Sequence, residues 1–251
     1  ILLATGLWVL TASFFRHMQG FQRAGNRLFF FAFLVLGTAF AWKWTSTAEH
    51  PLQHLSDVLF ALSILYFPLG ATLKKLFRLN IQWYDPLINI LLLTPVVFLC
   101  QKPPQPLPPI LLSPYFIPHV TAYCTGYLFL IKAFPLSLAS LSTADSKLRF
   151  TYERSAYLCV LLGLPFISAG LILGSLWARK AWGDWWGWDP KELWSLATWL
   201  IYVILIHCKN IAGTRGIAVR NILVILGFVA LVATLTWVNL SRLFQGLHTY
   251  A

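Results

Sequence analysis

Tryptophan is concentrated in one short segment of this chain. Six of the twelve tryptophans fall within residues 182–199, whose sequence is WGDWWGWDPKELWSLATW. Membrane proteins enrich tryptophan at the lipid–water interface, but an ordinary interfacial belt spreads it over many helix ends. So dense a cluster predicts an aromatic surface that binds something large, flat and apolar. A simple interfacial anchor is the alternative interpretation.

Two histidines are expected to approach this aromatic surface. His119 stands at the start of the fifth apolar segment and His248 follows the eighth, on the same predicted side of the membrane as the tryptophans. Neutral imidazoles are common iron ligands, and a haem iron takes its axial ligands one from each face. The pair therefore predicts a bis-His haem site, with solvated or interfacial histidines as the alternative.

The other histidines carry weaker predictions. His207 lies fourteen residues after Leu193, or about 21 Å along a helix, near the far end of the seventh segment. An ionisable group inside a span is a functional candidate, although a histidine that interacts favourably with the helix dipole is an equal alternative. Either His50 or His54 could line the haem cavity. His17 is expected to be solvated in a basic loop.

The end of the tryptophan cluster has a local structural explanation. Asp189 is a preferred helix N-cap, Pro190 suits the first helical position, and Glu192 completes a capping-box pattern. We therefore expect the seventh helix to begin at Asp189. Arg179 and Lys180 are candidates to pair with haem propionates, and charges that merely flank the membrane are an equally good explanation.

Composition indicates an integral membrane protein. The 251 residues are 58% hydrophobic and 11% charged, with a mean hydropathy of +0.69, whereas soluble domains are about 25% charged. The net charge of +11 predicts positive-inside loops rather than nucleic-acid binding. The four cysteines form no CxxC pair, so we expect neither a thiol-redox pair nor a zinc site of the usual spacing.

The apolar segments that must position these residues are expected to be helices, because backbone groups in lipid need internal hydrogen bonds. The prediction is an all-α, polytopic membrane helix bundle of about eight transmembrane helices. It forms a single integral-membrane domain, 1–251, with an external Trp-rich loop at 178–194. The first apolar run is short for a span of about twenty residues, so the N-terminus is expected to be incomplete. The predicted segments are 1–15, 27–44, 57–73, 84–100, 115–141, 156–177, 193–208 and 221–239.

Basic residues predict which loops face the cytoplasm or its equivalent, such as a stroma. Twelve lie in alternate loops that we assign to the inner side, which leaves the Trp-rich loop, a Pro-rich loop and the C-terminus outside. The twelve are Arg16, Arg23, Arg27, Lys74, Lys75, Arg78, Lys147, Arg149, Arg154, Lys209, Arg215 and Arg220.

The motif at 182–189 resembles that of a known superfamily. WGDWWGWD matches throughout the pattern WGxWWxWD, which marks the external loop of the haem-handling proteins of cytochrome c biogenesis. The continuation DPKELW resembles the system II synthetase subunit, of CcsA or ResC type, more than the system I delivery or lyase subunits. The helix count agrees with that branch. The resemblance is strongest from Tyr152 to Tyr250, and His50-Pro51-Leu52 and His119-Val120 echo family motifs upstream.

The resemblance implies a function. Family members move haem b across the membrane and hold it in the external loop, where its vinyl groups form thioethers with the CxxCH thiols of apocytochrome c. His119 and His248 match the two external ligands, and His207 matches an inner haem ligand whose counterpart comes from a partner subunit. His54 and Glu49 depart from the family pattern, so no ligand role is carried over to His50 or His54. The haem-presenting loop residues would be Trp182, Trp185, Trp186, Trp188 and Asp189. Those four tryptophans and Trp194 would bind the haem.

The implied protein is a cytochrome c synthetase (haem lyase) subunit, active with a second system II membrane subunit of CcsB or ResB type. Its other expected partners are apocytochrome c and a thioredoxin-like thiol reductant. No nucleic acid is expected as a partner. The expected location is a bacterial inner membrane or a thylakoid membrane, with the Trp-rich loop on the periplasmic or lumenal side. Two alternatives stay open, namely a haem exporter or delivery protein without ligation chemistry and a haem-free transporter with a tryptophan anchor.

Overall fold

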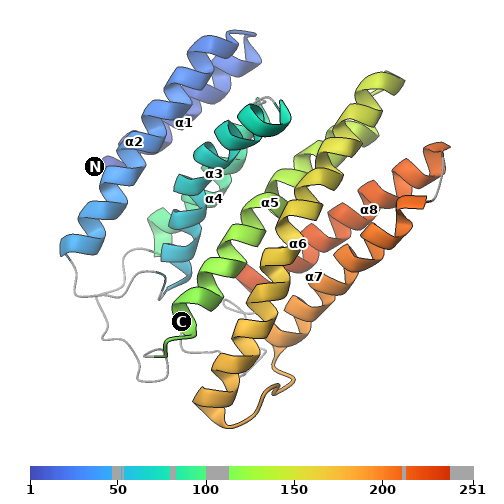
Figure 1. The fold of residues 1–251 in the computed structure, drawn as a ribbon. Coiled ribbons are helices and arrows are strands. Elements are labelled where there is room, and N and C mark those ends of the chain that lie inside the picture. The colour runs from blue at the N-terminus through green and yellow to red at the C-terminus, as the bar shows by residue number, and fades with distance from the viewer. Residues whose placement is uncertain (47–51, 53, 80–82, 100–112, 211–212, 238–251) are drawn as a thin grey trace. The chain divides into compact units, whose positions relative to one another are not determined.

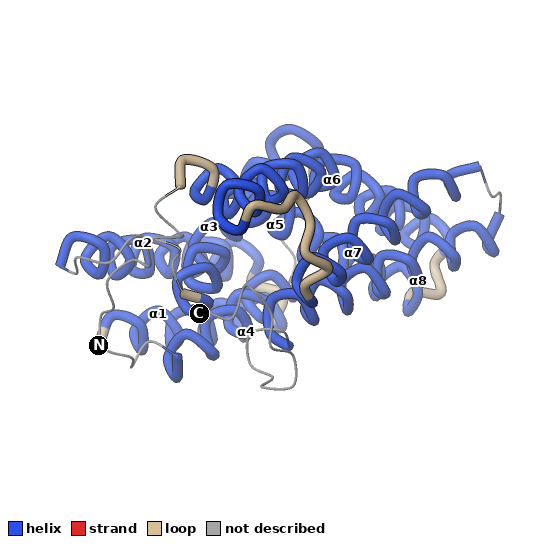
Figure 2. Tube along the Cα trace, turned by 90° about the horizontal axis from the view of Figure 1, so that it is seen from below, coloured by secondary structure: helices blue, strands red, loops and turns tan. Residues whose placement is uncertain are grey.

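The computed structural model describes residues 1–46, 52, 54–79, 83–99, 113–210 and 213–237. That part of the chain folds into eight α-helices and no strand (Figure 1), so the predicted all-α membrane helix bundle is confirmed. Figure 2 shows how little of the described chain is loop, the longest such stretch joining α6 to α7. The helices are α1 Leu2–Met18, α2 Gln22–Ser46, α3 Leu55–Phe77, α4 Tyr84–Leu99, α5 Phe116–Ser142, α6 Ser146–Trp182, α7 Pro190–His207 and α8 Gly213–Val232, the last continuing as a π-helical turn, Ala233–Trp237.

The helices group into two compact units, residues 1–108 and 109–251. The first contains α1 to α4 and the second α5 to α8. Within the first unit α1 packs on α2 and α4, and α3 also packs on α4; within the second α5 packs on α6 and α8, and α7 on α8. That the whole chain forms a single domain stays a prediction.

Five helices are long and apolar enough to cross a membrane, namely α2, α3, α5, α6 and α8 with its π-helical turn. The other three, α1, α4 and α7, have 17, 16 and 18 residues, slightly fewer than the twenty or so of a typical span. Each of the eight predicted apolar segments nevertheless coincides with one helix.

Helix α6 is much longer than its predicted segment, 156–177, since it runs for 37 residues. It begins early because the Asp145 carboxylate accepts hydrogen bonds from the backbone N–H groups of Lys147 and Leu148, an N-cap. Lys147, Arg149 and Arg154 therefore lie on the first turns of α6 rather than in a loop, which corrects the prediction. The first turns of α6 carry several charged residues, so their low hydropathy did not indicate a helix.

His17 is not solvated, contrary to expectation. It lies near the end of α1 with only 3% of its surface exposed. Its Nδ1 is 2.8 Å from the Ser13 carbonyl oxygen and its Nε2 is 2.9 Å from the Asn26 amide oxygen. A Cβ at Gly25 of α2 would come within 2.3 Å of the ring, so glycine there admits the imidazole between the helices. His17 is a structural residue of the α1–α2 pair.

Two glycines bring α5 and α6 into close contact within the second unit. A Cβ at Gly163 would lie 2.9 Å from the Phe129 Cβ and 3.1 Å from the Gly126 carbonyl oxygen. A Cβ at Gly126 would lie 2.5 Å from the Ile167 Cδ1. Small residues commonly allow such approach between membrane helices, where packing replaces the hydrophobic driving force. The position of α6 along α5 is thus set by backbone contact.

Replacing Gly163 by alanine is expected to force these helices apart and to destabilise the protein by about 1–3 kcal/mol, as overpacking does. Thermal unfolding in detergent, followed by circular dichroism, measures the effect. Gly37→Ala in α2 is the matched control, because a Cβ there meets nothing within 4 Å. It should be neutral or stabilising, since alanine favours helix over glycine by about 1 kcal/mol. Equal melting temperatures for the two variants would contradict the close-packing account.

Candidate functional site

The Trp-rich loop is shorter than the predicted 178–194 and comprises residues 183–189, because α6 continues to Trp182 and α7 begins at Pro190. Gly183 ends α6 in the left-handed conformation, with φ of 92°. The Arg179 guanidinium donates a hydrogen bond to the Gly183 carbonyl and fixes that end. Trp182 and Trp194 therefore stand on helices, and only three of the predicted site tryptophans belong to the loop.

The predicted capping box is confirmed at the start of α7. Asp189 Oδ1 accepts a hydrogen bond from the Lys191 backbone N–H at 2.8 Å. Glu192 Oε2 accepts from the backbone N–H groups of Gly187 at 2.8 Å and Asp189 at 3.2 Å. Asp189 is buried. The motif's acidic residues thus fold the loop onto the helix, as its spacing predicted.

The loop indoles differ in exposure. Trp185 and Trp188 are 55% and 68% exposed, whereas Trp186 is half-buried and packs edge-to-face on Trp188 with ring centroids 6.2 Å apart. The Trp186 Nε1–H is buried and has no acceptor among the described residues. An unsatisfied buried donor costs about 1–3 kcal/mol, and an acceptor on a bound molecule would remove that cost.

Trp188 has a strained backbone. Its φ is 56°, in the left-handed region that costs an L-residue with a Cβ roughly 1–2 kcal/mol. A large aromatic residue in that region is unusual, and such strain concentrates at functional sites. The loop therefore keeps this indole exposed to solvent although the ring is apolar, and keeps its backbone in a disfavoured conformation.

His119 is joined to the Trp-rich loop by stacked aromatic rings. Its imidazole stacks on Trp177 of α6, with centroids 5.9 Å apart and an interplanar angle of 25°. Trp177 is 1% exposed and in turn contacts Trp182 edge-to-face, with centroids 4.9 Å apart. His119 Nδ1 donates to the Gly170 carbonyl oxygen at 2.9 Å. The predicted ligand and the predicted tryptophans therefore lie at the same end of the second unit.

Sequence reasoning missed Trp177. The available signal was its place five residues before Trp182, at the end of an apolar segment where an interfacial tryptophan is commonplace. Only the pairing of α5 with α6 shows that it contacts His119.

Charged groups around the loop already have local roles. Lys180 lies over the Tyr115 ring at 6.0 Å, a cation–π contact, and Arg179 caps α6. Lys191 precedes the apolar part of α7, which starts at Leu193, and burial lowers the pKa of its ammonium to about 8 while Asp189 opposes the shift. The Lys191 ammonium is therefore partly desolvated at the first turn of α7.

Two of the remaining predicted histidines, His54 and His207, lie within the described residues. His248 and His50 lie outside them. His54 is the N-cap of α3, and its backbone N–H donates to Asp57 Oδ2 at 3.4 Å. His207 is the last residue of α7 and is exposed, at the end of the helix opposite the Trp-rich loop.

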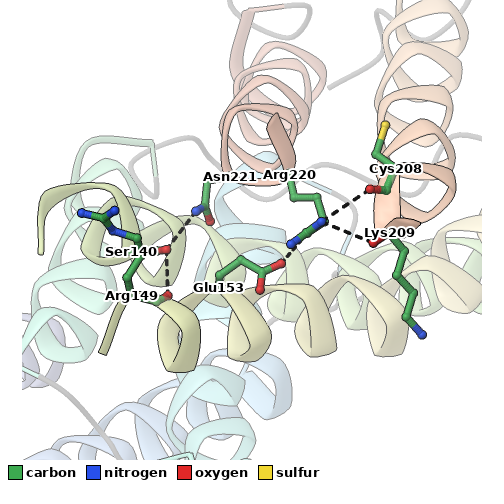
Figure 3. Close-up of polar contacts among 7 residues, drawn as sticks. All are labelled: Ser140, Arg149, Glu153, Cys208, Lys209, Arg220 and Asn221. Atoms are coloured by element: carbon green, nitrogen blue, oxygen red, sulfur yellow. Dashed lines mark hydrogen bonds and ion pairs between the residues drawn. The ribbon is translucent and has the colours of Figure 1, made fainter. Parts of the chain in front are cut away.

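A polar network holds the end of α7 beside His207 (Figure 3). Arg220 of α8 donates from Nε to Glu153 Oε1 of α6 at 2.5 Å, and both side chains are largely buried. Its Nη1 donates to the carbonyls of Cys208 and Lys209 at 3.5 and 3.4 Å, where the last carbonyls of a helix lack intrahelical partners. One guanidinium thus joins α6, the end of α7 and α8.

Beside it, Asn221 Nδ2 of α8 donates to Ser140 Oγ of α5 at 2.9 Å, and Ser140 Oγ donates to the Arg149 carbonyl of α6 at 3.0 Å. Figure 3 shows this chain next to the Arg220 cluster. All four helices of the second unit are therefore linked at this basic end.

Glu153→Ala is expected to remove the carboxylate that neutralises the largely buried Arg220 guanidinium, and to cost about 3–5 kcal/mol of stability. Thermal unfolding in detergent measures the loss. The double variant Glu153→Met with Arg220→Met should recover most of it, because no charge is then left unpaired. A double variant as unstable as Glu153→Ala would show that the ion pair is not the source of the loss.

Trp188→Gly is expected to raise the stability of the protein by about 1 kcal/mol, because glycine adopts positive φ without strain. Trp185→Gly is the control, since Trp185 is also more than half exposed but has no positive φ, and it should lower stability. Chemical denaturation in detergent compares the two. A loss of stability in Trp188→Gly as large as that in Trp185→Gly would refute the strain argument.

The chain is similar to known proteins in both sequence and fold. A family described as cytochrome C assembly protein matches residues 1–248. Similar proteins include cytochrome c biogenesis protein CcsA of Synechococcus sp. (strain RCC307), 25% identical over 86% of this chain and 81% of the relative. That of Prochlorococcus marinus (strain NATL2A) is 26% identical over 99% and 89%. That of Chlamydomonas reinhardtii is 30% identical over 83% and 63%.

Among solved structures, the cytochrome c haem lyase CcmF has a similar fold, with a TM-score of 0.67 and 22% identity. The similarity covers 94% of this chain and 45% of that longer one, and at this identity it concerns the fold alone. The match to the family model over almost the whole chain, together with the apolar helices, identifies an integral membrane protein of cytochrome c biogenesis. The chain belongs to the cytochrome c assembly protein family, as a CcsA-type protein of system II.

Proposed function

We propose that the chain binds haem b at the end of α5 and presents it for covalent attachment to the CxxCH motif of apocytochrome c. His119 supplies one axial ligand and His248 the other. Trp182, Trp185, Trp186, Trp188 and Trp194 surround the porphyrin, and Asp189 holds the Trp-rich loop to α7. Haem is here a substrate, which leaves on the product.

The observation that carries this proposal is the contact of His119 with Trp177 and of Trp177 with Trp182. It sets an imidazole, a common iron ligand, against an aromatic wall that continues into the Trp-rich loop. A porphyrin is flat and apolar over most of its area, with two carboxylates at one edge. The buried Trp186 Nε1–H offers a donor of the kind that a propionate oxygen accepts.

The attachment itself requires orientation more than acid–base chemistry. Each cysteine thiol adds across one haem vinyl group, forming a C–S bond while the thiol proton passes to the other vinyl carbon. Atoms balance, and no group leaves. Both nucleophiles belong to the apocytochrome. The contribution of this chain is to hold haem so that vinyls and thiols meet in reactive geometry, which can supply several kcal/mol of the barrier.

The topology that we propose has two haem positions. His207, exposed at the end of α7, is an inner ligand whose counterpart comes from a second system II membrane subunit of CcsB or ResB type. Haem enters at that basic end, which faces the cytoplasm or stroma. The Trp-rich loop faces the periplasm or thylakoid lumen, where a thioredoxin-like reductant keeps the apocytochrome thiols reduced. The chain acts as a synthetase subunit together with its partner.

His119→Ala is expected to abolish the low-spin bis-His absorption of the outer haem and to stop cytochrome c maturation, because the iron loses one axial ligand. The measurement uses the complex of this chain with its partner subunit, by visible absorption and by covalent haem in a co-expressed apocytochrome. His248→Ala should give the same result. His54→Asn, which keeps a residue suited to capping α3, is the control and should leave both readouts unchanged.

Two results would overturn the proposal. An unchanged spectrum with intact maturation in both ligand variants would remove the outer haem site. Haem bound by wild-type complex but never attached covalently to apocytochrome would instead indicate a delivery or export protein.

A further inference from the structure

His119 meets α6 along one edge of its ring. A Cβ built on Gly174 would lie 2.6 Å from His119 Cε1 and 2.8 Å from Nδ1, but 3.6 Å from Nε2. The Nδ1–Cε1 edge therefore lies directly on the glycine backbone, with Nε2 farther from it. Any side chain at position 174 would occupy space that the imidazole now fills, since contacts under 3.0 Å force something to move.

Three groups of α6 together fix the orientation of the His119 imidazole. The Gly170 carbonyl receives the Nδ1–H at 2.9 Å, Gly174 admits the ring edge one turn later, and Trp177 stacks on the ring face. Positions 170 and 174 are four residues apart and share a helix face. Tyr123, one turn along α5, closes another side with an edge-to-face contact at 5.0 Å. The ring plane is thus determined by helix packing.

The carbonyl partner also determines the tautomer. A carbonyl oxygen only accepts, so Nδ1 must carry the proton, and in a neutral imidazole the lone pair is then on Nε2. Metal-bound histidines are commonly oriented in this way by a backbone carbonyl on the other nitrogen.

We propose that Gly174 is a positioning residue, which with the Gly170 carbonyl fixes the plane and tautomer of His119 so that Nε2 is the atom offered to the haem iron. This inference rests on the proposed function, because it assumes that His119 is an iron ligand. It assigns a role to the stretch of α6 before the tryptophan motif.

The test replaces Gly174 by alanine in the complex with the partner subunit, loaded with haem. Excess apomyoglobin serves as a haem acceptor. The haem that the wild-type complex retains against it and that His119→Ala loses is taken as the outer haem. Gly174→Ala should weaken retention of that fraction by about 10- to 100-fold, as loss of a metal ligand's supporting contact does. The low-spin ferric electron paramagnetic resonance signal of its remaining outer haem should also shift, because the ring is turned. Gly37→Ala is the control and should match wild type in both.

A double-mutant cycle separates positioning from folding. In a His119→Ala background the ring that the new methyl would meet is absent, so adding Gly174→Ala should lower neither thermal stability nor haem retention further. If Gly174→Ala alone folds poorly, the double variant should fold as well as His119→Ala. An equal loss in both backgrounds would show that Gly174 acts elsewhere and would overturn the inference.

Two further outcomes distinguish failure of the positioning role of Gly174 from failure of the proposed function. Wild-type haem retention and spectrum in Gly174→Ala, with haem lost in His119→Ala, would overturn the positioning role while the proposed function stands. Full haem retention in His119→Ala would overturn both.

Discussion

The close approach of α5 and α6 is the contact on which the rest of the second unit depends. Gly126 and Gly163 bring the two backbones together and fix their register. Because both helices continue beyond this contact, the same register sets which residues face each other several turns away, where His119 lies against Gly174 and Trp177. At the other end it brings the Ser140 hydroxyl to the Arg149 carbonyl. A packing contact in apolar surroundings thus controls the geometry of polar groups at both ends.

The polar groups themselves follow one physical rule, since a buried donor or acceptor must be paired. Arg220 satisfies Glu153 and two carbonyls at the end of α7, and Glu192 satisfies two backbone N–H groups at its start. Helix α7 is therefore fastened at both termini by side chains that also fix its neighbours. Among the described residues a few buried polar atoms depart from the rule, such as Ser137 Oγ and Asn221 Oδ1. The Trp186 indole N–H is another, and it lies in the loop proposed to receive a ligand.

How much the sequence predicts depends on whether a feature is local. The eight helices follow from apolar runs, and the Asp189 capping box follows from four consecutive residues, so both were predictable. The first turns of α6 were not, because Lys147 and Arg149 hide a helix whose cap, Asp145, precedes it. The burial of His17 depends on Gly25 of another helix, and the contact of His119 with Trp177 depends on helix register. Neither leaves a periodic signal, and the histidine pairing with His248 lies outside the described residues.

The length of α6 bears on how apocytochrome c, the proposed substrate, would reach the Trp-rich loop. Its 37 residues extend about 55 Å at 1.5 Å per residue, whereas the hydrocarbon layer is only about 30 Å thick. The apolar stretch within it ends at Trp177, so we expect the last turn, which carries Arg179 and Lys180 and ends at Trp182, to lie beyond the lipid tails. In the proposed function, unfolded apocytochrome c then meets the indoles from the aqueous phase without dehydrating its own backbone.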